Sequence, residues 1–133
     1  MSQEDVEVVR QMLSAFNEED IERIFALTHR DVAIEIGPSV SAEPDTYRGH
    51  AGMRRYIESF QDAMSEIRFE AERLYDAGTA VVIALRLTAR GRQTGIVVEQ
   101  QSAGVWTISE GKVIGVRTFP STADALDAAG VRQ

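Results

Sequence analysis

The first half of the chain carries apolar residues at intervals of three and four, the period of a helix with one buried side. The first stripe consists of Val6, Val9, Leu13 and Phe16. It predicts a helix that ends near Asn17. A short second helix is predicted from Asp20 and a third from Gly49. Their apolar positions are Ile21, Ile24, Phe25 and Leu27 in the second, and Met53, Tyr56, Ile57, Phe60 and Met64 in the third.

The second half alternates apolar and polar residues, which indicates β-strands with one buried face. The alternation begins at Ile67, and turn residues divide it into a first strand and three more over residues 80–90, 96–108 and 112–119. A β-branched stretch, Val32–Ile36, predicts an earlier strand, with a turn over residues 28–31 before it and a loop from Gly37 to Tyr47 after it. Ser121 and Asp124 form a capping pattern for a short helix that ends at Gly130.

This order of elements predicts an α+β fold. Helices come first and a run of hairpin-linked strands follows, so we expect a cone-like curved antiparallel sheet packed against the N-terminal helices. The length of 133 residues suits one domain, residues 1–133. A curved sheet closed by helices encloses a space, and an apolar lining would make that space a small-molecule pocket.

Composition narrows the chemistry. The chain has no cysteine, which excludes disulfides, thiolate metal sites and a cysteine nucleophile. Its net charge of −7 argues against nucleic acid or an anionic membrane as a partner. The only two histidines, His29 and His50, stand far apart in sequence, so we expect neither a metal site nor a cofactor. Residues 1–5 are acidic and lack an export-signal pattern, so a cytoplasmic location is expected.

Four phrases in this order resemble the SnoaL-like branch of the nuclear-transport-factor-2-like superfamily. They are residues 15–20 (AFNEED), Asp31-Val32, residues 47–52 (YRGHAG) and residues 105–113 (VWTISEGKV). The resemblance covers nearly the whole chain and implies a cone-shaped α+β barrel, usually dimeric, with a pocket between helices and sheet. It implies no single activity, because the superfamily holds ketosteroid isomerase, polyketide cyclases, dehydratases, epoxide hydrolases and noncatalytic modules.

The acids of the ketosteroid isomerase are missing from the corresponding positions. That enzyme uses a tyrosine and a protonated aspartate as an oxyanion hole and a second aspartate as the base. The resemblance places Met12 at the tyrosine and Ile36 at the base, and a residue between Gln100 and Gly104 at the other aspartate. Neither methionine nor isoleucine moves a proton, so isomerisation by that machinery is not expected.

The resemblance also implies which residues line the pocket. Most are apolar, and Gln100, Ser102, Thr118 and the Trp106 N–H supply polar groups. The expected lining is Met12, Phe16, Ile34, Ile36, Tyr56, Phe60, Ile83, Leu85, Gln100, Ser102, Trp106, Val116 and Thr118. The same strand phase turns Leu87, Val98, Ile108 and Ile114 inward, although one slipped residue would reverse a whole face. The alternative is that these residues simply fill a core.

Catalytic candidates are few. Glu35 would be the only carboxylate in the pocket if its strand shifted by one residue, and otherwise it faces solvent. His50 and Tyr47 flank the start of the third helix, where His50 could shuttle a proton or simply occupy the first helical turn. Gln100 could donate or accept a hydrogen bond but not act as an acid.

Two functions therefore stay open. The leading one is binding of a small apolar or polyketide-like molecule, with general acid–base catalysis by such candidates. The other is a noncatalytic small-ligand-binding or dimerisation module, and whether the chain is an enzyme depends on an ionisable residue in the pocket. A homodimer is expected through the outer sheet face, where Arg86, Glu99 and Arg117 stand on successive strands.

Overall fold

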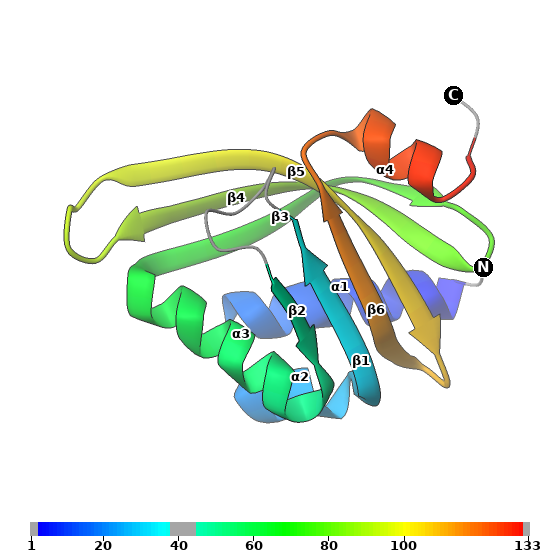
Figure 1. The fold of residues 1–133 in the computed structure, drawn as a ribbon, viewed down its shortest axis with the longest axis horizontal. Helices are drawn as coiled ribbons and strands as arrows, with labels where there is room; N and C mark the ends of the chain where they lie inside the picture. The colour runs from blue at the N-terminus through cyan, green and yellow to red at the C-terminus, as the bar shows by residue number, and fades with distance from the viewer. Residues whose placement is uncertain (1–2, 38–44, 132–133) are drawn as a thin grey trace.

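The computed structural model describes residues 3–37 and 45–131 and has the predicted α+β architecture (Figure 1). Helices and strands follow in the order α1 Gln3–Asn17, α2 Ile21–Ala26, β1 Thr28–Ile36, β2 Asp45–Arg48, α3 Gly49–Ala63, β3 Met64–Asp76, β4 Ala80–Gly91, β5 Val97–Ser109, β6 Lys112–Phe119 and α4 Thr122–Ala128. None of the helices in the described ranges is long and apolar enough to span a membrane.

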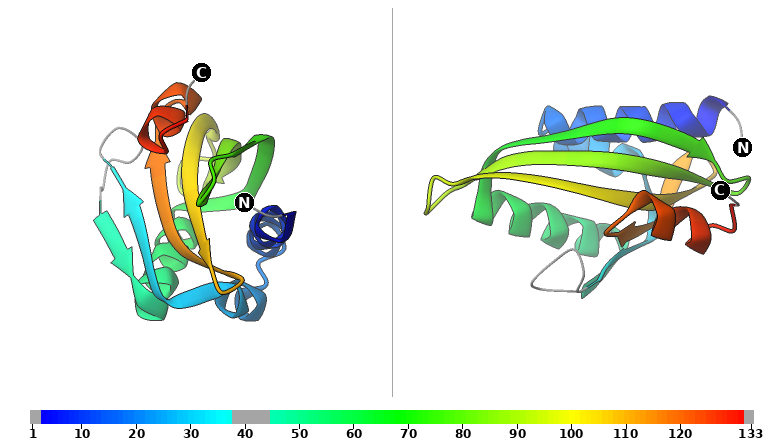
Figure 2. Two further views of the ribbon diagram at one scale, coloured as in Figure 1. Left: turned by 90° about the vertical axis from the view of Figure 1, so that its right-hand side faces the viewer. Right: turned by 90° about the horizontal axis from the view of Figure 1, so that it is seen from above.

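The six strands form one curved, open sheet in the order β2-β1-β6-β5-β4-β3 (Figure 2). The predicted curved antiparallel sheet is confirmed with one exception, because β1 and β6 pair in parallel. The other neighbours are antiparallel. Alternation along a strand shows which residues are buried but not which strand lies beside it, so the sequence could not reveal this pairing.

Element boundaries differ from the prediction at the junctions between helices, strands and loops. The predicted turn over residues 28–31 is the first part of β1, in which the buried Thr28 donates a 2.6 Å hydrogen bond to the carbonyl of Ile24. The end of the predicted loop is strand β2, whose Tyr47 pairs with Ile34, while residues 38–44 lie outside the described residues. Met64 begins β3 instead of ending the stripe of α3.

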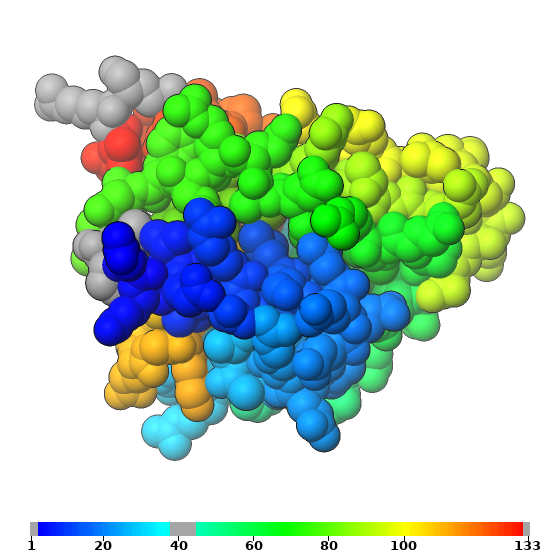
Figure 3. Space-filling model, turned by 180° about the vertical axis from the view of Figure 1, so that it is seen from behind, coloured from blue at the N-terminus to red at the C-terminus, as the bar shows by residue number. Residues whose placement is uncertain are grey.

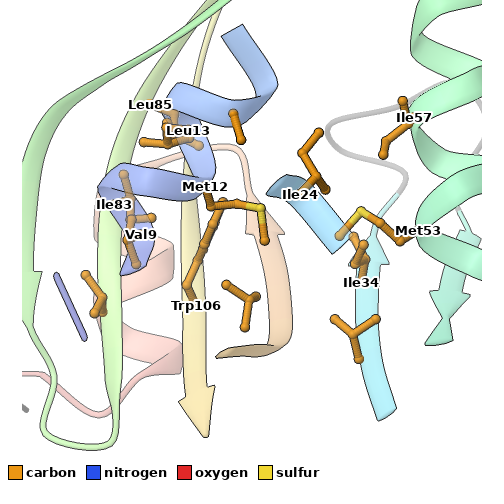
Figure 4. Close-up of a cluster of buried hydrophobic side chains, with 14 of the residues drawn as sticks. Val9, Met12, Leu13, Ile24, Ile34, Met53, Ile57, Ile83, Leu85 and Trp106 are labelled. Carbon is orange, nitrogen blue, oxygen red and sulfur yellow. The ribbon is translucent and has the colours of Figure 1, made fainter. Parts of the chain in front are cut away.

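The helices divide between the two faces of the sheet. The N-terminal helix α1 packs with α3 on the concave face, over a core that includes Met12, Met53 and Trp106 (Figure 4). The short α4 packs on the opposite face, where Ala125 and Leu126 bury Val82 and Val105. The sequence pattern placed helices on one face only, because it predicts that α4 forms but not where it packs.

The side chain of Asn17 fixes the end of α1 to the edge strand β3, which lies side by side with α1 (Figure 3). Its amide oxygen accepts a 2.7 Å hydrogen bond from the backbone N–H of Phe69, and its amide nitrogen donates a 2.9 Å hydrogen bond to the Phe69 carbonyl. These are backbone groups that an edge strand would otherwise leave without a strand partner.

Replacing Asn17 should therefore destabilise the fold. We expect Asn17→Ala to lower the free energy of unfolding by about 1–3 kcal/mol, because two partly buried backbone groups lose their partners. Asn17→Asp should also destabilise, since a carboxylate cannot donate to the Phe69 carbonyl. Urea denaturation followed by circular dichroism measures both. Gln93→Ala, at an exposed turn position, is the control and should stay near the wild-type value. An Asn17→Ala midpoint equal to that of the control would contradict this role.

Candidate functional site

A cavity of about 320 Å³ lies between α1, α3 and the concave face of the sheet. Its walls are mainly apolar, with single polar groups from several elements. The lining residues are Met12, Leu13, Phe16, Ile34, Ile36, Tyr47, Met53, Tyr56, Ser59, Phe60, Met64, Phe69, Leu85, Leu87, Val98, Gln100, Ser102, Trp106, Val113, Val116 and Thr118. Among these described lining residues there is no Asp, Glu, His, Lys or Arg.

Of the residues predicted to face inward, Ile108 and Ile114 do not reach the cavity. Ile83, from the predicted lining, does not reach it either. It faces inward as expected but is fully buried beside Val9 of α1 (Figure 4). The helix covers the concave face at this end of the sheet, so Ile83 packs in the core and Leu85, two residues further along β4, reaches the lining.

A bulge changes the inward phase of β6. Thr107 pairs with Gly115 and Ile108 pairs with Val113, so Ile114 is an extra residue between them. As a result Val113, which is fully buried, lines the cavity instead of the predicted Ile114. This exchange could not be predicted from the sequence, because Val113 and Ile114 are both typical strand residues and nothing in the pattern marks a bulge between them.

Glu35 and His50 lie outside the cavity lining. Glu35 is on the outer face of β1, where its half-exposed carboxylate lies 3.8 Å from the Arg117 guanidinium. Its neighbours Ile34 and Ile36 take the inward positions. The one-residue shift that would have turned Glu35 into the pocket is therefore absent from β1. The Nε2 atom of His50 lies 2.8 Å from the Thr28 carbonyl oxygen, and its ring lies 5.2 Å from that of Phe25. This contact makes Nε2 the protonated nitrogen, which holds the first turn of α3 against β1.

Tyr47 and Gln100, by contrast, do line the cavity. Tyr47 is 9% exposed, and the Arg55 guanidinium lies 4.6 Å from its ring centroid. Helix α3 can pack closely on β2 here because residue 52 is glycine. A Cβ at that position would lie only 2.7 Å from the Tyr47 carbonyl carbon. Gly52 therefore determines how closely the helix approaches the tyrosine.

Five aromatic side chains of the lining contact one another in a continuous series, which we call the aromatic row. Its rings are those of Tyr47, Tyr56, Phe60, Phe69 and Phe16, at successive centroid distances of 5.3, 5.2, 5.9 and 5.8 Å. All four pairs are edge-to-face, the arrangement that the ring quadrupoles favour. The row begins on β2, passes along α3 and ends on β3 and α1.

Sequence reasoning missed part of the lining. The residues that it did not assign to the lining are Leu13, Met53, Ser59, Met64, Phe69 and Val113. The helical stripes had marked Leu13 and Met53 as apolar positions, but a stripe does not show which of its residues face a cavity. The position of Phe69 depends on the pairing of β3 with β4 and on its contact with α1, which no local pattern contains.

The Tyr56 hydroxyl is held in its neutral form. Burial raises the pKa of Tyr56 well above its ordinary value of 10.0, and the nearby Tyr47 raises it further. A phenol in this state can donate a hydrogen bond to a ligand but does not serve as a base near neutral pH. Among the described residues, no group of three His, Asp or Glu side chains is placed to hold a metal ion.

The charged residues expected at a dimer interface lie on the outer face of the sheet. Arg86 and Glu99 form an ion pair of 2.9 Å, in which both side chains are about half exposed. This pairing raises the pKa of the Arg86 guanidinium, chiefly through the hydrogen bond to Glu99. Arg117 does not join them, because its carboxylate neighbour is Glu35 on β1. The homodimer itself stays a prediction.

Spectrophotometric titration can test the raised pKa of Tyr56. A raised folded-state pKa gives a stability contribution that is intact below the ordinary value of 10.0 and is lost as the pH rises through the folded pKa. We expect one tyrosinate absorbance step to appear only well above pH 10, at the onset of alkaline unfolding. Tyr56→Phe should remove this step, whereas the matched variant Tyr75→Phe should keep it. A late step that persists in Tyr56→Phe would assign it to another residue.

Solved structures with this fold are numerous, and all three named below have low sequence identity. An NTF2-like protein of unknown function from Burkholderia pseudomallei is 19% identical with a TM-score of 0.79, over 96% of this chain and 97% of that one. TerC, crystallised with polyporic acid, is 19% identical with a TM-score of 0.78, over 96% and 98%. An LEH-like epoxide hydrolase from M. tuberculosis is 17% identical with a TM-score of 0.74, over 96% and 90%.

These likenesses establish the fold, and the sequence itself establishes the family. A search among curated proteins finds no match. The family model of the SnoaL-like domain, however, matches residues 9–116, which include α2, α3, strands β1–β5 and most of α1 and β6. The chain therefore belongs to the SnoaL-like domain family.

Proposed function

We propose that this protein binds a small, largely apolar aromatic molecule in its cavity and does so without general acid–base catalysis. The observation that carries the proposal is the lining itself. It combines an aromatic row with aliphatic walls and, among the described residues, contains no ionisable group that transfers protons near neutral pH. Of the four sequence candidates for catalysis, Glu35 and His50 lie elsewhere, and Tyr47 and Gln100 offer hydrogen bonds only.

The dimensions of the cavity support this proposal. A volume of about 320 Å³ is at the lower end of the range for small-molecule sites. Edge-to-face rings leave flat faces and edges toward the cavity, against which a planar ring system stacks favourably. TerC, a structural relative crystallised with polyporic acid, supports an organic ligand for this fold. The epoxide hydrolase relative shows that the same fold also carries an enzyme, so the fold alone does not decide between binding and catalysis.

Filling the cavity should abolish binding. Ser102 lines the cavity, whereas the preceding residue of the strand, Gln101, is exposed and lies on the other face. We expect Ser102→Phe to weaken binding of the fluorescent probe 1-aminoanthracene at least about tenfold, because the new ring occupies the space the probe needs. Gln101→Phe adds the same ring to the other face and should bind within about twofold of wild type.

The sole tryptophan of the chain lines the cavity, so its fluorescence provides a second readout for the same titration. Thermal unfolding checks that both variants fold. Equal affinity of Ser102→Phe and Gln101→Phe would contradict binding in this cavity, and no binding by the wild type of any aromatic probe would contradict the function.

We also propose that two copies associate through the outer sheet face that α4 leaves uncovered. This face carries the Arg86–Glu99 pair, and the hairpin beside it exposes Ile96 and Val97, which are 62% and 61% exposed. Large apolar side chains this exposed are typical of contact surfaces.

Light scattering after size-exclusion chromatography tests the dimer. At micromolar concentration we expect twice the chain mass of 14.7 kDa. Val97→Glu should shift the protein toward monomer, because it places a charge on the contact surface. Gln93→Glu, in the nearby turn, is the matched control and should remain dimeric. A wild-type protein that is strictly monomeric would overturn the proposal.

A further inference from the structure

The Trp106 indole N–H is a buried donor that has no hydrogen-bond partner within residues 3–37 and 45–131. The residue is 6% exposed, stands on the inner face of β5 and lines the cavity. Its Nε1 atom makes no hydrogen bond to any residue that the structure describes. Buried polar groups without a partner are rare in folded proteins, and each one calls for a physical explanation.

Glycine at position 104 fixes the direction of this N–H. Gly104 lies two residues before Trp106 on the same face of β5, and the indole folds back over it. A Cβ at position 104 would lie 2.7 Å from Trp106 Nε1 and 3.0 Å from its Cδ1. Any other residue would therefore push the indole away. The nitrogen edge of the ring thus lies over Gly104, which stands between Trp106 and the cavity-lining Ser102 on this face of β5.

Further hydrogen-bonding groups surround this position. Gly104 pairs with Thr118 of β6, a lining residue whose hydroxyl donates a 2.8 Å hydrogen bond to the Glu35 carbonyl. Ser102 also lines the cavity from the same strand. The wall formed by β5 and β6 thus adds these polar groups to its valines. The aromatic row supplies ring surfaces from α3, α1 and the two edge strands.

The chemistry of these groups restricts the ligand. An indole N–H donates and cannot accept, so the ligand atom beside it must be an acceptor. The described lining has no Lys, Arg or His to neutralise a carboxylate, and burying an unpaired charge is costly. A neutral carbonyl or hydroxyl oxygen meets both conditions, while a plain hydrocarbon would leave the donor unpaired.

We infer that the ligand is an aromatic molecule bearing a neutral carbonyl or hydroxyl oxygen, which accepts a hydrogen bond from Trp106 Nε1. The inference rests on the proposed function and narrows the ligand from aromatic molecules in general to those that carry a neutral oxygen acceptor. In this arrangement Gly104 acts as a positioning residue, because it sets the orientation of the indole and does not touch the ligand through a side chain.

A pair of probes of the same shape tests the hydrogen bond. 2-Acetylnaphthalene carries a carbonyl oxygen, and 2-isopropenylnaphthalene has a CH₂ group in its place. Calorimetric titration gives the ratio of the two affinities. The wild-type ratio, ketone over hydrocarbon, should exceed that of Trp106→Phe about fivefold or more, the effect of one neutral hydrogen bond. Comparing ratios cancels the different hydration of the two probes.

Two further measurements guard against a variant that fails to fold. The chain has one tryptophan, so its nitrogen-15 spectrum has a single indole N–H signal. In the wild type the ketone should move this proton signal downfield and the hydrocarbon should not. Gly104→Ala keeps the indole but displaces its nitrogen edge, and it should lower the affinity ratio as Trp106→Phe does.

The outcomes separate the two proposals. If both probes bind but the affinity ratio is the same in the wild type and Trp106→Phe, the inference is wrong and the proposed function stands. The same holds if the ketone binds without moving the indole signal. If neither probe binds the wild-type protein, the proposed function fails and the inference fails with it.

Discussion

The open sheet has two free edges, and the contacts that bridge them determine the rest of the structure. Strands β2 and β3 are these edges, and α3 joins one to the other both along the chain and through the aromatic row. Each edge-to-face pair contributes about 0.5–1.5 kcal/mol beyond the burial of its area. Helix α3 spans the gap between these two edge strands and so holds the sheet in its curved form. The cavity lies between the helix and the concave face of the sheet.

The two ends of the concave face differ in how far they are filled. Toward the start of α1, Val9 packs against Ile83 in the buried core, and neither residue lines the cavity (Figure 4). Toward the long β4–β5 hairpin, the corresponding inward positions are Leu85, Leu87, Gln100 and Ser102, which line the cavity. The same alternating pattern therefore produces core at one end and a binding surface at the other, and the course of α1 decides which.

Alternation and the helical period report burial directly, so local pattern predicted most of the helices and strands and the stripe of α3 that includes Phe60. The resemblance to the SnoaL-like branch supplied the strand phase, and with it the inward positions of Leu85, Ser102 and Trp106. Both failed where a non-local pairing or a bulge decides. The parallel β1–β6 pair, the exchange of Ile114 for Val113 and the contact of Phe69 with α1 are of this kind. Glu35 was left open for the same reason, since its face depended on strand register.

The link between Asn17 and Phe69 also bears on how this protein avoids aggregation. Strand β3 is long and lies at the edge of the sheet, where its backbone could pair with a strand of another molecule. The Asn17 side chain occupies both backbone groups of Phe69, at the centre of the strand. Register shifts between Ser65 and Arg68 and between Ala71 and Arg73 interrupt the regular ladder on either side. A single amide side chain thus caps the middle of a sheet edge laterally, as a residue at a helix end caps the helix, and makes the backbone of Phe69 unavailable for intermolecular β-pairing.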